Sequence, residues 1–131
     1  MKIKQTTFYA LRAIRRIYVE DKPVITSTVI AEKEELSQGV LLRLLRTLNH
    51  AGILEVHQGR GTICGGFSLV KKIDEITLLE VIDVMEHIDI CSHLGEEFQI
   101  KEKQLFNKCE QINKHLREEL SKYTIRDLFE L

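Results

Sequence analysis

Several residue types that interrupt helices or mark special environments are scarce in this chain. Its 131 residues include one proline, Pro23, seven glycines, three cysteines and no tryptophan. The scarcity of proline and glycine favours a mostly helical protein, because both residues interrupt helices. No apolar run approaches the roughly 20 residues of a membrane span, and the N-terminal MKIK lacks the apolar core of a signal peptide. We therefore expect a cytoplasmic protein with no membrane partner and with reduced cysteines.

The formal net charge is only −1, but the charges are unevenly distributed. Residues 1–72 hold 12 Lys and Arg against 6 Asp and Glu, a net of +6. Residues 73–131 hold 7 against 14, a net of −7. The basic half is attracted to phosphates and the acidic half is repelled by them, so the asymmetry modestly favours a nucleic-acid partner.

Residues 6–52 have the pattern of three helices, of which the last two form a helix-turn-helix. Apolar residues at helical spacing predict the first helix at 6–20, and Pro23 follows its end. Thr26 is a good N-cap for a second helix at 27–34, and Ser37 caps a third at 38–51. Gly52 stands where a C-terminal glycine cap belongs.

The third helix has two distinct faces. Its apolar residues are expected to point inward: Val40, Leu41, Leu44, Leu45 and Leu48. Its other face is expected to be exposed: Gln38, Gly39, Arg43, Arg46, Thr47 and His50. Taken alone, this pattern is typical of an amphipathic helix with solvated arginines, whereas in a helix-turn-helix it is typical of a helix that enters a major groove.

The next segment predicts a β-wing. Short strands are expected at 53–56 and 67–70, with Gly59, Gly61, Gly65 and Gly66 around Arg60 at the tip. Arg60 would reach a minor groove or a phosphate. The segment is no phosphate-binding P-loop, because no Gly-Lys-Ser/Thr follows.

The acidic half is predicted to be helical as well. Thr77 and Glu80 form a capping box that starts a helix at 78–87. A long helix is expected at 96–123, with a narrow apolar stripe close to a coiled-coil seam, whose dimerisation residues are Leu105, Cys109, Ile112, Leu116 and Leu120. Such a helix spans roughly 40 Å, which suggests a second copy as its partner. A short closing helix is expected after Thr124, packed on that partner.

The order of these motifs resembles the Rrf2 family of bacterial winged-helix regulators over nearly the whole chain. That family includes an iron–sulfur cluster regulator, a nitric-oxide-sensitive repressor and a cysteine-metabolism repressor. The resemblance is carried by YALRA at 9–13, IAE at 30–32, AGIL at 51–54, GGFSL at 65–69, ITLLEV at 76–81 and YTIRDL at 123–128.

The resemblance implies a transcriptional regulator, expected to be a repressor, that acts as a homodimer on a roughly palindromic operator in double-stranded DNA. The fold class is then mostly α with a small β-wing: a winged helix-turn-helix domain at 1–75, followed at 76–131 by a further helix, a sensor-like loop and the long dimerisation helix. The residues expected to contact DNA are Lys2, Lys4, Thr26, Ser37, Gln38, Gly39, Arg43, Arg46 and Arg60.

This sequence departs from the family pattern in its recognition helix. Val40 stands where the family usually has tyrosine, and Leu42 and Arg43 replace a more polar pair. The wing is also longer than usual. These departures indicate a different operator rather than a loss of binding.

Cluster-binding members of the family have three cysteines before the long helix. Cys91 fits the first position, but Glu97 and Lys103 occupy the other two, so the usual iron–sulfur site is incomplete. No cofactor is expected, and an iron–sulfur cluster stays an alternative only with other ligands. The remaining sensor or metal candidates are His87, His93 and Cys109. Cys91 is also a candidate thiol switch, and Cys64 is a second one that fits a strand-edge residue better. Cys109 fits a buried structural residue.

Two other functions compete with that of a DNA-binding regulator. A winged helix without DNA binding can serve as a protein-interaction module, and Leu42 would enlarge an apolar patch for it. An enzyme is not expected, because the sequence has no nucleophile motif, cofactor fingerprint or complete metal-ligand set.

Overall fold

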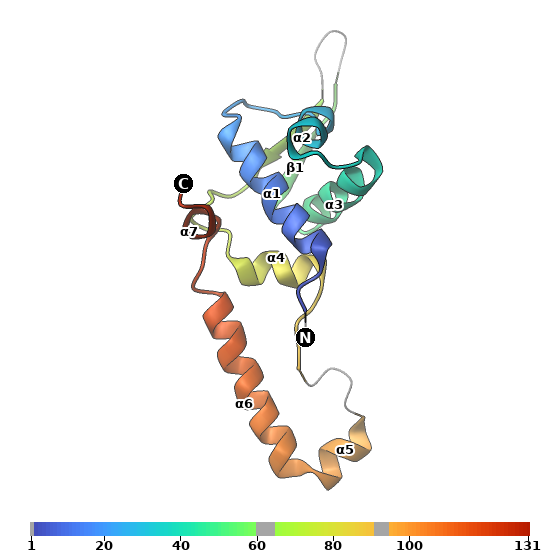
Figure 1. Ribbon diagram of the computed structural model, residues 1–131, viewed down its shortest axis with the longest axis vertical. Helices are drawn as coiled ribbons and strands as arrows, with labels where there is room; N and C mark the ends of the chain where they lie inside the picture. The colour runs from blue at the N-terminus through green and yellow to red at the C-terminus, as the bar shows by residue number, and fades with distance from the viewer. Residues whose placement is uncertain (1, 60–64, 91–94) are drawn as a thin grey trace.

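A computed structural model describes residues 2–59, 65–90 and 95–131, and Figure 1 shows their arrangement. Helices α1 (Gln5–Val19), α2 (Ser27–Glu34) and α3 (Gln38–His50) form one body with strands β1 (Leu54–His57) and β2 (Gly66–Leu69), and α4 (Leu78–Met85) lies across its lower end (Figure 1). Helix α6 (Lys103–Leu120) extends away from this body, and α7 (Ile125–Phe129) returns to it (Figure 1). The predicted fold class, mostly helical with a two-stranded wing, is confirmed.

The helix-turn-helix forms where the capping residues predicted it. Helix α1 is Gln5–Val19, α2 is Ser27–Glu34 and α3 is Gln38–His50. The Thr26 hydroxyl accepts a hydrogen bond from the Val29 N–H at 3.3 Å, and the Ser37 hydroxyl accepts one from the Val40 N–H at 3.4 Å. Each cap satisfies an N–H that has no partner within its helix, which fixes where α2 and α3 begin.

Both helices of the motif end in a left-handed residue. After α3, Gly52 has φ +83°, and the Ile53 N–H bonds to the Leu48 carbonyl at 3.0 Å. After α2, Glu35 has φ 55°, and the Leu36 N–H bonds to the Ala31 carbonyl at 2.9 Å. These are Schellman closures, for which glycine is the favoured residue.

Glu35→Gly is therefore expected to raise the free energy of unfolding by about 0.5–1 kcal/mol. A glutamate in the left-handed region has a steric cost that glycine lacks, and the greater freedom of glycine in the unfolded chain offsets part of the gain. Urea unfolding at a fixed protein concentration measures the change. Glu32→Gly, inside α2, is the control and is expected to be destabilising by about 1 kcal/mol; an equal loss in both variants would contradict the prediction.

The wing is a two-stranded antiparallel sheet, β1 (Leu54–His57) and β2 (Gly66–Leu69). Phe67 of β2 also exchanges two backbone hydrogen bonds with Ile25, at 2.8 and 2.9 Å. A Cβ added at Gly66 would lie 2.5 Å from the Ile25 carbonyl oxygen. The glycine is needed because the strand runs against the chain just before α2, which ties the wing to the helix-turn-helix.

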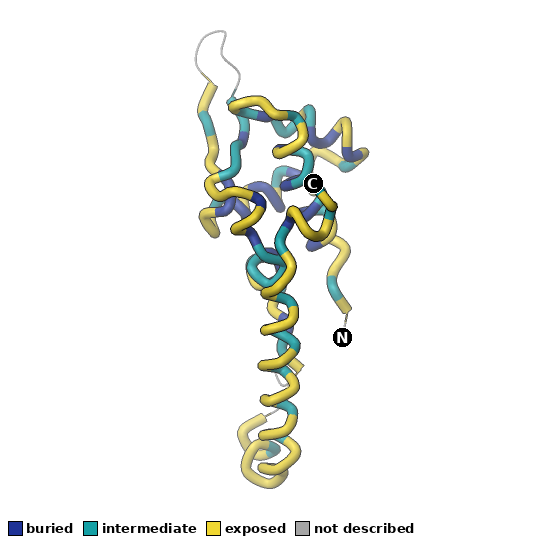
Figure 2. Tube along the Cα trace, turned by 90° about the vertical axis from the view of Figure 1, so that its left-hand side faces the viewer, coloured by how far each residue is buried: buried dark blue, intermediate teal, exposed yellow. Residues whose placement is uncertain are grey.

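The core is formed by apolar side chains from α1, α3, the wing and α4. Ile14, Leu41, Leu45, Ile82 and Ile125 are among its fully buried members. Figure 2 shows that the buried residues gather in the body, while α6 is only exposed or half-buried. Burial of this apolar surface holds the helix-turn-helix and wing in one body.

Helix α4 (Leu78–Met85) begins at Thr77, whose hydroxyl accepts from the Glu80 N–H at 3.1 Å. The other half of the predicted capping box does not form, because the Glu80 carboxylate accepts from Lys71 at 2.6 Å. The helix also ends before the predicted residue 87, since Glu86 is extended. Leu78 and Met85, at the two ends of the helix, are half-buried.

The chain is closed where α7 (Ile125–Phe129) returns beside the start of α4. The Leu78 N–H donates to the Tyr123 carbonyl at 2.8 Å, and the Ile125 N–H donates to the Ile76 carbonyl at 2.9 Å. A capping box of Thr124 and Asp127 starts α7, and hydrogen bonds from the Thr124 backbone and side chain lower the pKa of Asp127.

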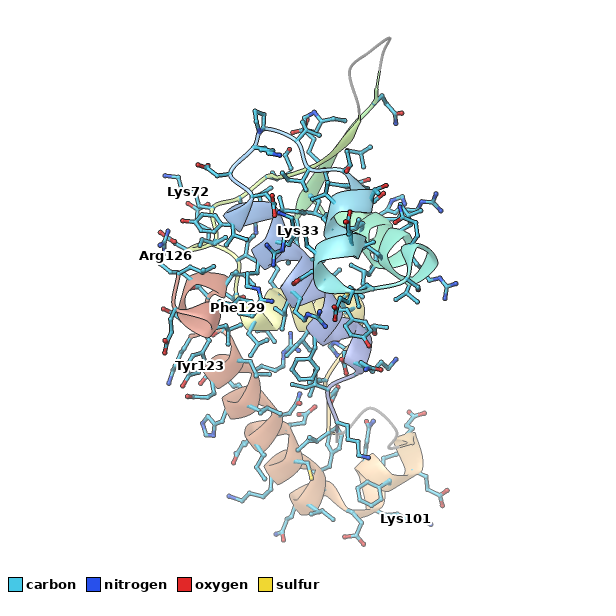
Figure 3. All side chains as sticks on the ribbon, turned by 45° about the horizontal axis from the view of Figure 1, so that its top comes forward. Lys33, Lys72, Lys101, Tyr123, Arg126 and Phe129 are labelled. Atoms are coloured by element: carbon cyan, nitrogen blue, oxygen red, sulfur yellow. The ribbon has the colours of Figure 1, made fainter. Side chains whose placement is uncertain are left out.

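Helix α7 packs on its own chain. The ring of Phe129 lies under the Arg15 guanidinium of α1, 4.6 Å from its centre, and Arg126 pairs with Asp74. Figure 3 shows Phe129 on the side of α7 that faces α1. Ile125 is fully buried, so core packing determines where this helix lies.

The predicted long helix is wrong in its extent. Two helices form, α5 (Glu96–Lys101) and α6 (Lys103–Leu120), and they meet at Glu102 with φ −116° and ψ 50°. No residue of either helix is buried, so no core contact holds the two in line. The 18 residues of α6 span about 27 Å rather than 40 Å.

Candidate nucleic-acid interface

The outer face of α3 carries a row of exposed residues at helical spacing. Gly39, Arg43, Arg46 and His50 are all exposed and lie opposite the buried leucines of the helix. Within the described ranges, no hydrogen bond or ion pair engages the guanidinium of Arg43 or Arg46. Both cations are therefore available to a ligand that approaches α3 from outside.

Val40 differs from the prediction, which placed it in the inward stripe. Its side chain is 37% exposed, and it borders a hollow of about 210 Å³ together with Thr6, Arg43, Leu44, Thr47 and Met85. Val40 lies in the first turn of α3, where the start of α1 and the end of α4 leave this hollow instead of covering the side chain.

The N-terminal end of α3 is fixed by polar contacts with α2. The Gln38 side-chain amide donates to the Ser27 hydroxyl at 2.7 Å. The predicted contacts Thr26 and Ser37 use their oxygens as caps, and each hydroxyl keeps a proton that it can donate. The two helix N-termini, together with exposed Gln38, thus present hydrogen-bond donors beside the arginines of α3.

The N-terminal segment lies beside the same face. Lys2 and Lys4 are exposed, and the Lys4 backbone N–H donates to the Glu86 carboxylate at 2.7 Å. The Thr7 hydroxyl donates to the same oxygen, and Thr6 borders the hollow that Arg43 also borders. Glu86 thus holds the start of α1 near the recognition helix.

Three arginines of α1 are turned inward rather than outward. Glu34 of α2 is 4% exposed, and its carboxylate lies 3.1 Å from Arg15, 3.4 Å from Arg16 and 3.7 Å from Arg12. Arg12 also donates to the Glu34 carbonyl oxygen. These cations are part of the +6 of the basic half but are used to attach α2 to α1.

The buried position of Glu34 was not predicted from the sequence, although its spacing in α2 indicates it. Glu34 follows Ile30 by four residues, which places it on the same inward face of α2. The adjacent Glu20 is similarly paired: hydrogen bonds from Lys33, at 2.8 Å, and then Arg16 lower its pKa. The Glu34 cluster therefore sets the position of α2, and with it the recognition helix.

A polar pair joins the two strands of the wing, from the last residue of β1 to β2. The His57 ring nitrogen Nε2 lies 2.7 Å from the Ser68 hydroxyl, and Glu55 lies 4.0 Å from the same nitrogen. The predicted DNA contact Arg60 and the strand-edge candidate Cys64 lie outside the described residues.

Helix α6 is held to α4 by a bidentate ion pair. Arg117 donates to both oxygens of Asp83, at 2.9 and 2.7 Å, and this hydrogen bonding raises the pKa of Arg117. The Ile90 N–H donates to Asn113 of α6 at 3.3 Å. The segment after α4 is thus attached to α6 at one end and, through Glu86, to α1 at the other.

The sensor candidates are only partly covered by the structure. Cys91 and His93 lie outside the described residues. His87 is exposed, with Nδ1 3.6 Å from Asp83, and Cys109 is a half-buried free cysteine on α6. Helix α4 ends at Met85, so His87 lies beyond it in the loop.

The donor atoms near this loop do not fit a three-cysteine cluster. Glu97 is paired with Lys101, and Lys103 is an exposed residue at the start of α6. Residues 2–59, 65–90 and 95–131 contain no group of three or more His, Cys, Asp or Glu placed to hold a metal.

The predicted dimerisation residues share one side of α6. Leu105 and Ile112 are 52% and 57% exposed, while Cys109, Leu116 and Leu120 are half-buried. An apolar row of this kind on an extended helix is available to another protein surface.

The described helices include none long and apolar enough to cross a membrane.

The comparisons with known proteins agree with this geometry. A family model described as Rrf2, iron-dependent transcriptional regulator, matches residues 3–131. The structure of CymR, the global cysteine regulator of B. subtilis, has a TM-score of 0.71 at 27% identity and covers 98% of this chain and 95% of that one. The structure of T. potens IscR has a TM-score of 0.69 at 24% identity, with 99% and 87% covered, which shows a shared fold.

A sequence relative extends the same comparison. The Synechocystis protein slr0846, provisionally named an HTH-type transcriptional regulator, is 28% identical over 87 residues, which are 66% of this chain and 57% of that protein. The chain spans just over half the length of the curated relatives it matches. The predicted family resemblance is confirmed by the family model.

Proposed function

Because this chain belongs to the Rrf2 family of transcriptional regulators, we propose that it binds specific DNA sequences and regulates transcription in the cytoplasm, as a repressor. The observation that carries the proposal is the exposed row on α3, in which Arg43 and Arg46 have no partner among the described residues. A helix with free arginines on its outer face fits the major groove, where arginine pairs with guanine.

The supporting contacts follow from the same geometry. Thr26, Ser37 and Gln38 lie at the N-terminal ends of α2 and α3. Exposed Lys2 and Lys4 precede α1, whose Thr6 borders the same hollow as Arg43. Cations and N–H donors of this kind meet phosphate oxygens. Gly39 lies within the exposed row itself. We also assign Arg60, which the sequence places near the wing tip, to a contact with a phosphate or a minor groove.

We also propose that the protein acts as a homodimer on a roughly palindromic operator. The support is the row of Leu105, Cys109, Ile112, Leu116 and Leu120 on a helix that buries no residue in its own chain. Two copies joined through α6 would place two recognition helices in successive major grooves, about 34 Å apart.

Arg43→Ala and Arg46→Ala are expected to weaken binding to the operator by about 5- to 150-fold each. A base-reading arginine contributes about 1–3 kcal/mol to the binding free energy. The loss of an arginine that contacts a phosphate would instead reduce the salt dependence of the affinity. Fluorescence anisotropy measures this with the gene's own upstream DNA and with random duplex across a salt series. Lys114→Ala removes an exposed cation from α6 and is the matched control, with unchanged affinity.

The alternative is a winged helix that binds another protein and no DNA. Leu42, its original motivation, is half-buried, so it contributes less apolar surface than expected, whereas Val40 contributes more. An absence of DNA binding at low salt, with a stoichiometric protein partner on purification, would favour this alternative over the regulator.

We also propose that the protein responds to redox state or to a metal, and one measurement tests this. An absorption spectrum of protein purified without oxygen, with iron measured on the same sample, tests for a cluster. Visible bands with matching iron would establish a cluster with unusual ligands. A colourless, metal-free protein would direct attention to Cys91 as a thiol switch.

A further inference from the structure

We propose that Val40 is a specificity-determining residue that reads the C5-methyl group of a thymine in the major groove, one or two base pairs from a guanine read by Arg43. The inference rests on the proposed function and makes it more specific, because it predicts which base pairs the operator contains.

Val40 is an exposed aliphatic residue on the helix that carries the free arginines. Its neighbours Leu41 and Leu44 are 0% and 3% exposed, whereas Val40 is 37% exposed. One side of it faces the hollow of about 210 Å³ between α3 and the segments that carry Thr6 and Met85. The core therefore makes little use of this side chain, which remains accessible to an apolar group from outside.

Gly39, the residue before Val40, supports a close approach of the DNA at this end of α3. A Cβ at this position would meet no atom of the described chain within 4 Å. Glycine makes a helix less stable than alanine does, and no atom of the described chain would clash with a side chain at this position. A base edge or sugar that lies against the first turn of α3 would leave room for glycine only.

The chemistry of the groove selects thymine for an aliphatic contact. The thymine methyl is the apolar group that a base pair presents in the major groove, and Arg43 has the fork that guanine accepts. Val40 and Arg43 border the same hollow and are one turn apart. A helical turn rises about 5.4 Å and a base pair about 3.4 Å, so the two contacted bases are one or two steps apart.

The experiment uses the full chain and its own operator, identified by selection from random duplex DNA. Each thymine of the operator is then replaced by deoxyuridine, which removes only the C5-methyl group. Affinity is measured for the wild type and for Val40→Ala. Because Val40 is exposed beside a hollow, alanine leaves the fold intact, which circular dichroism and urea unfolding verify.

The wild type is expected to lose about 3- to 10-fold in affinity at one thymine of each half-site, in line with the burial of one methyl group. Val40→Ala is expected to bind the thymine and deoxyuridine operators equally. Val19→Ala is the matched control, since Val19 is 43% exposed at the far end of α1; it retains the full sensitivity of the wild type.

Two results would overturn the inference while leaving the regulator in place: specific binding with no deoxyuridine effect, or a deoxyuridine effect that Val40→Ala retains. A complete lack of DNA binding at low salt would overturn the regulator and this inference together. The two failures are distinguishable because the first requires a measurable operator complex.

Discussion

Glu34→Ala is expected to lower the free energy of unfolding by about 2–4 kcal/mol. The substitution leaves three guanidinium groups facing one another without their shared carboxylate, and breaking a buried ion pair typically costs 3–5 kcal/mol. The expected loss is smaller than this typical cost because the side chains of Arg12, Arg15 and Arg16 are 35%, 32% and 24% exposed and are therefore partly solvated. Urea unfolding at a fixed protein concentration measures the loss.

Two further variants separate charge from packing. Glu34→Gln retains an oxygen that accepts from the arginines but removes the charge, so an intermediate loss is expected. Glu32→Ala removes an exposed carboxylate from the same helix and should change stability by less than about 0.5 kcal/mol. A loss below 1 kcal/mol for Glu34→Ala would show that water replaces the carboxylate.

Ile112→Glu is expected to convert the protein to a monomer and to weaken operator binding by about 100-fold. Ile112 is 57% exposed, so the substitution leaves the single chain folded, but a glutamate in an apolar seam between two helices is strongly unfavourable. Two linked half-sites gain about 10²–10⁴ in apparent affinity over separate ones, and a monomer loses that gain.

Sedimentation velocity and anisotropy on the same samples measure both parts of this prediction. Gln111→Glu adds an equal charge at an exposed position of α6 without removing an apolar group and is the matched control, with unchanged mass and affinity. A dimeric Ile112→Glu that binds as tightly as the wild type would remove α6 from the proposed interface.

The features that local chemistry controls could be predicted from the sequence. The caps at Thr26 and Ser37 determine where two helices begin, and Gly52 determines where α3 ends. Each wing strand is shifted by one residue from its expected position. The backbone pairing of Ile25 with Phe67 also fixes the position of β2, and the alternation of apolar and polar side chains along a strand does not indicate this pairing.

The features that failed depend on contacts between distant segments. The role of Glu34 depends on three arginines about 20 residues earlier, and the exposure of Val40 depends on how far α1 and α4 extend. The break at Glu102 lies in a stretch without proline or glycine, where periodicity alone favours a continuous helix.

The short backbone pairing of Thr77 with Thr124 has an evolutionary consequence. It brings together two points 47 positions apart, so the segment through α5 and α6 leaves the body after α4 and returns beside the start of α4. Insertions and deletions between α4 and α6 would therefore change the length of this segment without displacing the recognition helix.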